Sequence, residues 1–233
     1  MSPQTLSKTF DFCGEILPGL SEREESSEPS RMRGRVLKEH GKGLQGVEVL
    51  SRYPRPVTLN DGTVVNLRLL RKGDKARLIN FFTRIPPENC LDLREDVTDR
   101  ALVASWVDNL NFDLVLPVVS EYEGKIVGYI TLQRRYSGWK KHVGDVWLVV
   151  SKKFHKKGLQ SILIKEVIGL AAALGLEKLL VEIPVKVKMM EAMEAFSRCG
   201  FARLTVLEDM VKDQRGSYSG VVVMVYDLQR SHS

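Results

Sequence analysis

The pattern of apolar and polar positions divides the chain at about residue 53. Residues 1–52 are charged, contain Ser and Gly, and have few apolar positions at helix or strand spacing, as is typical of a flexible extension. After residue 52, apolar runs and helical stripes alternate between Gly and Pro turns. The sequence therefore predicts a flexible N-terminal extension over 1–52 and one folded domain over 53–230.

The first half of this domain predicts one strand, two helices and a hairpin. A turn signal at 60–62 precedes a β-rich run over 63–70. Two segments with apolar residues at helical spacing follow, and we expect Thr98 to cap the second helix. A hairpin around 123–125 then joins two β-rich runs, of which the second, 124–132, alternates most regularly.

The second half of the domain alternates strands and helices. A strand over 142–150 leads through a lysine-rich loop into a helix that begins at Gly158 and carries one apolar face. A strand, a helix over 187–199 and two strands around a polar loop at 209–219 complete the chain. The resulting order, β-α-α-β-β-β-α-β-α-β-β, predicts an α/β (α+β) fold with a mixed central sheet of about seven strands flanked by about four helices.

The amino-acid composition limits the classes of binding partner and the cellular compartment that we expect. The 233 residues carry a formal charge of +6 with a pI near 9.2, which favours nucleic acid, acidic proteins or a small polyanion such as a nucleotide phosphate. Three distant cysteines without a CxxC pair, and four scattered histidines, indicate neither a disulfide framework nor a metal site. With no apolar run of roughly 20 residues and no signal peptide pattern, we expect a soluble, cytoplasmic protein without membrane contact.

The junction at Gly158 is a candidate anion site. The first N–H groups of a helix lack intrahelical partners, and the helix dipole adds positive potential there. Four lysines lie in the preceding loop, and a glycine lets a ligand approach the backbone closely. Short strand-to-helix loops are common, however, and loop lysines usually face water. A P-loop and a GxGxxG motif are both absent from the sequence.

The element order and the sequence from Asp145 to Phe201 resemble the GNAT superfamily of acyl-CoA-dependent N-acyltransferases. The resemblance covers about Pro56 to Leu228, and the opening of the domain is similar to the GNAT domain of bacterial protein lysine acetyltransferases. The pyrophosphate motif of the family, Q/R-x-x-G-x-G/A, falls on residues 155–160, where only Gly158 matches strictly.

The resemblance implies acetyl-CoA or another acyl-CoA as cosubstrate and suggests where it binds. His155 takes the first motif position, and Gln160 replaces a small residue that would leave more room for the phosphates. Backbone amides are implied to hold the pantetheine arm at Val149 and Val150, and the pyrophosphate at Lys157, Gly158, Leu159, Gln160 and Ser161.

Asp145 is the candidate general base. An amine must be neutral to attack a thioester, and Asp145 is the only charge in a strand that is apolar on both faces, where burial raises a carboxyl pKa. The resemblance implies the same role, since lysine acetyltransferases carry a glutamate there. An equally weighted alternative is structural, with Asp145 capping the strand or pairing with Arg134, Arg135 or His142. Glu182, on the next strand, is a second carboxylate that either assists Asp145 or simply neutralises nearby lysines.

Two polar helpers common in the family are missing. The tyrosine that protonates the leaving thiolate is Phe196 here, and the asparagine near the start of that helix is Met189. The sequence therefore predicts an N-acetyltransferase whose thiolate is protonated by water, with a protein lysine as acceptor. The alternatives are a small-molecule amine acceptor, a non-catalytic acyl-CoA-binding regulatory module, and a nucleic-acid binder using the basic loop around Trp139.

Overall fold

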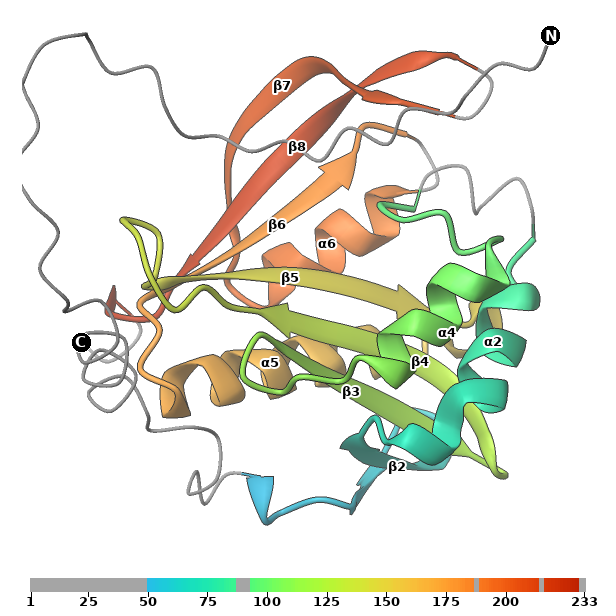
Figure 1. Ribbon diagram of the computed structural model, residues 1–233. Helices are drawn as coiled ribbons and strands as arrows, with labels where there is room; N and C mark the ends of the chain where they lie inside the picture. The colour runs from blue at the N-terminus through green and yellow to red at the C-terminus, as the bar shows by residue number, and fades with distance from the viewer. Residues whose placement is uncertain (1–49, 87–92, 187–188, 214–215, 231–233) are drawn as a thin grey trace, which may run out of the picture. The chain divides into compact units, whose positions relative to one another are not determined.

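The computed structural model describes residues 50–86, 93–186, 189–213 and 216–230 (Figure 1). The chain divides into two units, 1–41 and 42–233, and every described residue belongs to the second unit. The predicted extension over 1–52 therefore lies almost wholly outside the described residues. No described helix is both long enough and apolar enough to cross a membrane.

One mixed sheet of eight strands forms the centre of the described region, in the order β1-β2-β3-β4-β5-β6-β8-β7. All neighbouring strands are antiparallel except β5 and β6, which are parallel. The strands are β1 (Arg55–Thr58), β2 (Val64–Leu69), β3 (Val115–Tyr122), β4 (Lys125–Gln133), β5 (Val143–Val150), β6 (Lys178–Pro184), β7 (Ala202–Lys212) and β8 (Tyr218–Asp227).

Four α-helices of the described chain cover the two faces of the sheet, in agreement with the predicted fold (Figure 1). α2 and α4 lie on one face, and α5 and α6 lie on the other. Their bounds are α2 (Lys75–Thr83), α4 (Arg100–Asp108), α5 (Leu159–Ala173) and α6 (Met190–Arg198), with 3₁₀ turns η2 (Lys72–Asp74) and η3 (Lys152–Phe154).

Each face of the sheet has its own hydrophobic core because successive strand residues point to opposite faces. On β5, Val146 belongs to the larger core under α5 and α6. Its neighbour Trp147 packs against the smaller core under α2 and α4. The residues of β5 therefore divide between the two cores, which explains why nearly all of them are apolar.

The structure corrects two predictions in the first half of the domain, one on a strand and one on a helix cap. β1 was not predicted, since it has only four residues and contains Pro56. Asp99, not Thr98, caps α4: its carboxylate accepts the N–H groups of Ala101 at 2.8 Å and Leu102 at 3.2 Å. An aspartate at this position accepts these bonds directly, while the Thr98 hydroxyl donates to Asp96.

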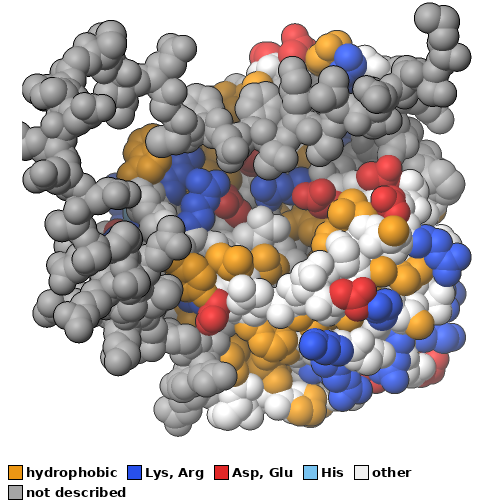
Figure 2. Space-filling model, in the orientation of Figure 1, with side chains coloured by type: hydrophobic (Ala, Val, Ile, Leu, Met, Phe, Trp, Pro, Cys, Tyr) orange, Lys and Arg blue, Asp and Glu red, His pale blue; other side chains and the backbone are white. Residues whose placement is uncertain are grey.

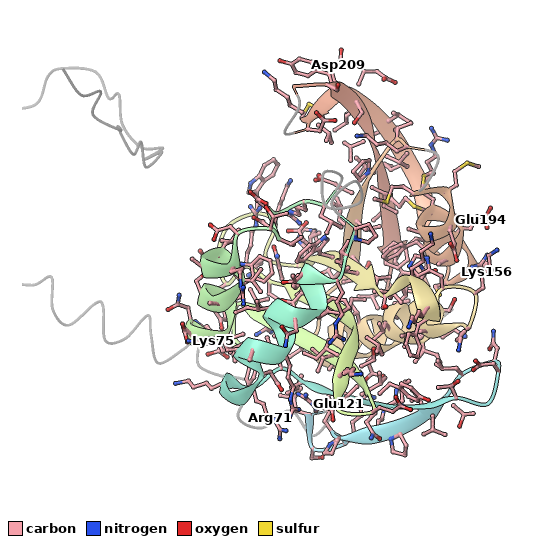
Figure 3. All side chains as sticks on the ribbon, turned by 90° about the vertical axis from the view of Figure 1, so that its right-hand side faces the viewer. Arg71, Lys75, Glu121, Lys156, Glu194 and Asp209 are labelled. Carbon is pink, nitrogen blue, oxygen red and sulfur yellow. The ribbon has the colours of Figure 1, made fainter. Side chains whose placement is uncertain are left out.

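The predicted polar loop over 209–219 is mostly strand. β7 continues to Lys212 and β8 begins at Tyr218, so the two form a long hairpin that projects away from the helices, with Asp209 in its projecting part (Figure 3). Two register shifts in β7 and the positive φ of Asp209 (54°) accommodate the polar residues. β7 is an exposed edge strand, and polar residues there do not oppose strand formation.

Buried ion pairs hold the early strands in place. Glu166 on α5 is 3% exposed and accepts hydrogen bonds from Arg52, Tyr53 and Arg55, which fixes the start of the domain on α5. On β2, Arg68 binds both carboxylate oxygens of the fully buried Asp74, at 2.6 and 2.9 Å. These contacts connect the start of the domain to α5, and β2 to the 3₁₀ turn η2.

Candidate active site

The parallel strands β5 and β6 pair over only three residues and then separate. Their last paired positions are Asp145 and Leu180, after which β6 continues its ladder with β8 alone. Figure 1 shows the two strands diverging from this point. We call this gap the β5–β6 opening. The edge of β5 that faces it, including Val149 and Val150, has no backbone partner on β6.

Asp145 lies at the start of this opening. It is only partly buried, less than expected for a strand that is apolar on both faces, because the sheet opens beside it. Among the described residues it makes no hydrogen bond or ion pair, and the alternative pairing with Arg134 is not found, since that side chain donates to the Asp113 carbonyl at 2.8 Å. Pairing with Arg135 or His142 is likewise absent from the described contacts of Asp145. Its carboxylate therefore has no partner within the part of the chain that the structure describes.

Glu182 lies on the same face of the sheet as Asp145. Leu180 is the direct partner of Asp145 on β6, and residues two apart on a strand share a face. Glu182 is exposed on the other side of the β5–β6 opening. A second carboxylate thus borders the same opening.

The start of α5 leaves backbone donors free, as the sequence predicts. Gly158 precedes the helix in the left-handed conformation, and no side chain caps it. The first helical bond joins the Ile162 N–H to the Gly158 carbonyl at 3.1 Å. Within the described region, the N–H groups of Leu159, Gln160 and Ser161 therefore have no acceptor, which suits an anion.

The glycine at 158 has a structural role in addition to the predicted one, which stays a prediction. Its φ is +84°, and a Cβ there would stand 2.9 Å from the side-chain oxygen of Asn60. Asn60 lies in the turn between β1 and β2, and its N–H donates to the Lys157 carbonyl at 3.0 Å. Glycine is thus required by the backbone conformation and by a neighbouring side chain.

The four loop lysines do not behave alike. The Lys157 ammonium pairs with Asp61 at 2.7 Å, and its hydrogen bond lowers the pKa of that carboxyl to about 2. Lys152, Lys153 and Lys156 are exposed, and Figure 3 shows Lys156 near the start of α5. These three remain free to attract an anion, while the side chain of Lys157 is held by the β1–β2 turn.

His155 connects β5 to α6. Its Nε2 lies 3.0 Å from the Val150 carbonyl and its Nδ1 lies 3.3 Å from a carboxylate oxygen of Glu191. The side chain thus spans from the end of β5 to the first turn of α6. Sequence reasoning did not predict this bridge, because Glu191 is 36 residues away.

The positions of the two missing helpers are apolar. Phe196 is 2% exposed and packs edge-on against Phe201, with ring centroids 4.9 Å apart. Met189 is partly buried against the same core. Neither side chain can donate a proton, so the leaving group needs another donor.

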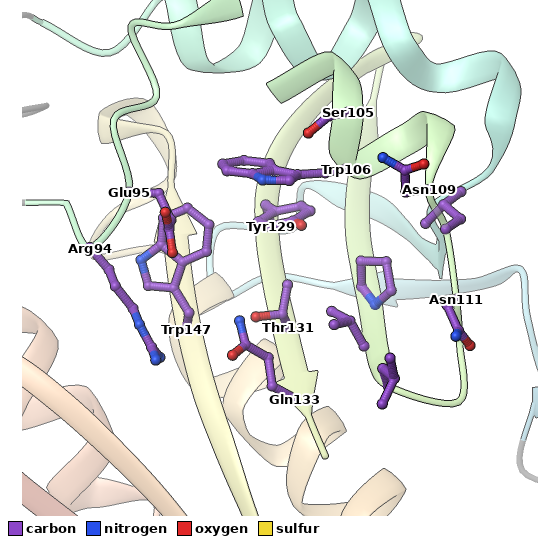
Figure 4. A pocket seen from close by; sticks show the side chains of 14 residues that line it. Arg94, Glu95, Ser105, Trp106, Asn109, Asn111, Tyr129, Thr131, Gln133 and Trp147 are labelled. Carbon is purple, nitrogen blue, oxygen red and sulfur yellow. The ribbon is translucent and has the colours of Figure 1, made fainter. Parts of the chain in front are cut away.

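A pocket of about 280 Å³ adjoins this site on the face covered by α2 and α4 (Figure 4). We call it the aromatic pocket. Asp145 pairs with Gln133 across β4 and β5, and Gln133 and Trp147 both line the pocket, so Asp145 borders one end of it. The lining residues are Arg94, Glu95, Ser105, Trp106, Asn109, Leu110, Asn111, Leu114, Val115, Pro117, Tyr129, Thr131, Gln133 and Trp147.

Three packed rings form the walls of the aromatic pocket. The Trp147 ring meets Trp106 edge-on at 5.7 Å and Tyr129 at 5.8 Å between centroids. Phe82 stacks on Trp147 with 6° between the ring planes and a centroid separation of 6.0 Å. Burial raises the pKa of Tyr129, which keeps its phenol neutral. Sequence reasoning missed this pocket, although alternating Tyr129, Thr131 and Gln133 gave a signal for one lined face.

The surface around the site carries both acidic and basic side chains. Figure 2 shows that this face of the molecule is hollowed beside α4, with acidic and basic side chains around the hollow. Trp139, in the loop between β4 and β5, is 87% exposed with Lys140 over its ring. No group of three or more potential metal ligands occurs among the residues that the structure describes.

Comparison with known proteins agrees with this geometry. A model of the Acetyltransferase (GNAT) family matches residues 77–201, which is more than half of the chain. The GNAT domain of PAT from S. lividans has a TM-score of 0.64 at 17% identity, covering 76% of this chain and 98% of that domain. No curated protein matches the chain.

Two further solved structures share the fold. RimJ from Mycobacterium smegmatis, in complex with CoA-disulfide, has a TM-score of 0.60 at 16% identity and covers 76% of this chain and 88% of its own. The ribosomal-protein-S5-alanine acetyltransferase from Vibrio fischeri has a TM-score of 0.60 at 14% identity, covering 70% and 92%. At these identities the likeness concerns the fold.

Proposed function

Because the chain belongs to the GNAT acetyltransferase family and is therefore an acyl-CoA-dependent N-acyltransferase, we propose that it acetylates a lysine side chain of a protein. The observation that carries the assignment of the site is the β5–β6 opening, which starts at Asp145 and leads to the uncapped first turn of α5. A carboxylate and three amides that have no partner within the described region thus border this opening.

Acyl-CoA binding follows from the free backbone groups. The amides of Leu159, Gln160 and Ser161 take the pyrophosphate, and the exposed lysines of the preceding loop add attraction. The edge of β5 at Val149 and Val150 takes the pantetheine arm, as an added strand would pair with it. The backbone of Lys157 and Gly158 and the ring of His155 shape the loop around the phosphates.

Direct transfer removes two protons from the acceptor nitrogen. The acceptor amine, with an ordinary pKa of about 10.4, loses the first proton to Asp145 directly or through a water molecule, and Asp145 later releases it to solvent. The neutral nitrogen then forms a bond to the thioester carbon, and the bond from carbon to sulfur breaks. The second proton leaves the nitrogen and passes through water to the CoA thiolate, because Phe196 cannot supply one, and the products are the amide and CoA.

The proposed acceptor is supported by the resemblance of the domain's opening to bacterial protein lysine acetyltransferases. The fold neighbour named as a ribosomal-protein-S5-alanine acetyltransferase also modifies an amine on a protein. A small-molecule amine is the second candidate, which the modest size of the aromatic pocket favours.

Calorimetry and label transfer test the proposal together. We expect acetyl-CoA to bind and labelled acetyl groups to appear on lysines of acceptor proteins or on added amines. Binding without transfer to any amine tested would identify a regulatory acyl-CoA-binding module instead. A salt-sensitive gel shift with DNA or RNA that CoA does not compete away would point to nucleic acid.

A further inference from the structure

The two edge strands of the sheet differ in how well they are protected from pairing with another chain. β1 has only four residues and contains Pro56, and both features disfavour a further strand. β7 has eleven residues, all of them exposed except the half-buried Val206 and Val211. Within the part of the chain that the structure describes, no strand pairs with the outer side of β7, so its outward backbone N–H and C=O groups can bind another strand.

Apolar side chains follow this unpaired edge. Leu204 and Met210 are each 65% exposed, and Leu207 is 39% exposed. On the neighbouring helix α6, Met190 is 53% exposed at a groove of about 350 Å³, which is lined by residues of α6 and β8 and by Arg203. Exposed apolar side chains beside free backbone groups are typical of a surface that binds another protein strand.

The edge of β7 is straight in its central part. Thr205, Val206 and Leu207 pair in regular order with β8. One register shift, with Leu204 as the extra residue, lies before this segment, and a second shift lies after Leu207. Bulges of this kind protect an edge where they occur, but they leave the central segment regular and able to take a partner strand.

Two opposite charges lie symmetrically about Val206. On β8, the pairing partners of Val206 and Arg203 are two residues apart, so Arg203 lies two register positions to one side of Val206. Glu208 is two residues to the other side, with a carboxylate oxygen 3.1 Å from where a Cβ on Gly220 would stand. All three side chains lie on the face covered by α6. Arg203 and Glu208 are exposed, and neither forms an ion pair with a described residue.

We propose that the outer edge of β7 binds the same edge of a second copy of this chain, antiparallel, with Val206 on the two-fold axis. Thr205 then lies opposite the partner's Leu207, and Arg203 lies opposite the partner's Glu208, each contact occurring twice. Opposite charges directly across two strands stabilise their pairing, and like charges oppose it. An isologous contact needs a self-complementary surface, and the equal spacing of these two charges supplies one.

The charges give a direct test by sedimentation velocity on the full chain. At low salt we expect a reversible equilibrium between the 26.3 kDa monomer and a dimer as the protein concentration rises. Arg203→Glu and Glu208→Arg are each expected to raise the dimer Kd about 10-fold or more, because each change makes both ionic contacts like-charged. Acetyl transfer, if it occurs, should be unchanged in both variants, since β7 lies outside the proposed active site.

Mixing the two variants tests the register itself. In the mixed dimer the two substituted side chains face each other with opposite charges, and so do the two native ones. The Kd of the 1:1 mixture should therefore return to within about 3-fold of the wild-type value. Arg100→Glu makes the same charge reversal at an exposed site on α4 and is the matched control. It should change the Kd by less than about twofold and should not restore dimers with Glu208→Arg.

The outcomes decide the interface independently of the proposed function. Restoration by mixing supports the antiparallel β7 contact and also shows that both variants are folded. A wild-type chain that stays monomeric at every concentration overturns the proposal. A dimer that neither variant weakens lies on another surface and overturns it as well. Weakening without restoration means that the two charges do not face each other, which overturns the pairing about Val206.

Discussion

Asp145 and Glu182 both border the β5–β6 opening, yet their surroundings differ. Asp145 stands where the strands separate and borders the aromatic pocket through Gln133. Glu182 is exposed farther along β6. At the scale of single residues, we favour Asp145 as the base because it lies where the strands separate, and a base must lie within hydrogen-bond reach of the amine or of one bridging water.

Replacing Asp145 tests this assignment. Asp145→Asn keeps the shape and removes the base, and we expect kcat to fall about 10²- to 10⁴-fold with an unchanged acetyl-CoA Kd. Glu182→Gln is the matched variant, with an expected change below about 3-fold, as a side chain outside the chemistry gives. A larger loss from Glu182→Gln than from Asp145→Asn would reverse the two roles.

Gly158 provides a second test at the residue scale. Gly158→Ala places a Cβ at a φ of +84° and against Asn60, so the free energy of unfolding should fall by about 1–3 kcal/mol. Gly175→Ala has a similar φ of +72° but open space around the new methyl group, and it isolates the backbone contribution. Urea denaturation of both variants measures the difference. Equal losses would mean that the Asn60 contact is easily relieved.

At the scale of elements, the turn between β1 and β2 supports the loop before α5. Asn60 bonds the Lys157 backbone, and Asp61 holds the Lys157 ammonium. The short β1 is itself fixed to α5 through Arg55 and Glu166. The turn and the start of α5 are therefore held together from both sides, although about 100 residues separate them in the sequence.

Releasing Lys157 should change cosubstrate affinity. The pKa of Asp61 is lowered to about 2, so its carboxylate stays charged in any ordinary assay. Asp61→Asn frees the ammonium next to the first turn of α5, and we expect CoA to bind ~2- to 5-fold more tightly at low salt. Calorimetry with CoA and with acetyl-pantetheine, which lacks the pyrophosphate, provides the check. An equal gain for both ligands would argue against a phosphate contact.

At the scale of the whole described domain, the two faces of the sheet differ in the size of their cores and in the presence of a pocket. The face under α5 and α6 holds the larger core, and the other face combines a smaller core with the aromatic pocket. Arg68, Asp74 and Glu121 form a largely buried ion cluster that joins β2, η2 and β3 beneath α2. The aromatic pocket shares only β3 with this cluster, through Val115 and Pro117.

The cluster predicts a pH dependence of stability. Burial opposes ionisation of Asp74, but hydrogen bonds from Arg68 and the Arg71 backbone prevail and lower its pKa. A lowered folded pKa contributes stability that is fully present above the unfolded value of about 3.9 and is lost as the pH falls through the folded value. Thermal unfolding from pH 7 to pH 2 should therefore show this loss below about pH 4.

Two variants measure how much the buried charge of Asp74 contributes to stability. Asp74→Asn breaks a buried pair and should lower the free energy of unfolding by about 3–5 kcal/mol at pH 7, with a smaller difference at pH 3. Asp108→Asn, which removes an exposed partner of Lys75, should change it by less than about 1 kcal/mol. A pH-independent difference between wild type and Asp74→Asn would mean that packing, not charge, stabilises this cluster.

Elements with strong local signals were predicted well, and those without them were not. The regular apolar face of α5 and the alternation along β4 gave their bounds to within one or two residues. β1 is too short to show alternation, and the polar edge of β7 resembles a loop in sequence. Its strand form depends on pairing with β8, which lies outside any local window.

By itself, the sequence determined the order of most elements and the start of α5 at Gly158, and it led to the proposals of an anion site there and of Asp145 as the base, because periodicity, a glycine and an isolated charge are local properties of the chain. Tertiary structure alone decided where β5 leaves β6, which groups meet Gly158 and Lys157, and that Trp106, Tyr129 and Trp147 enclose one pocket. These features join residues far apart in sequence, and such contacts form only when the sheet and its two helical layers pack together.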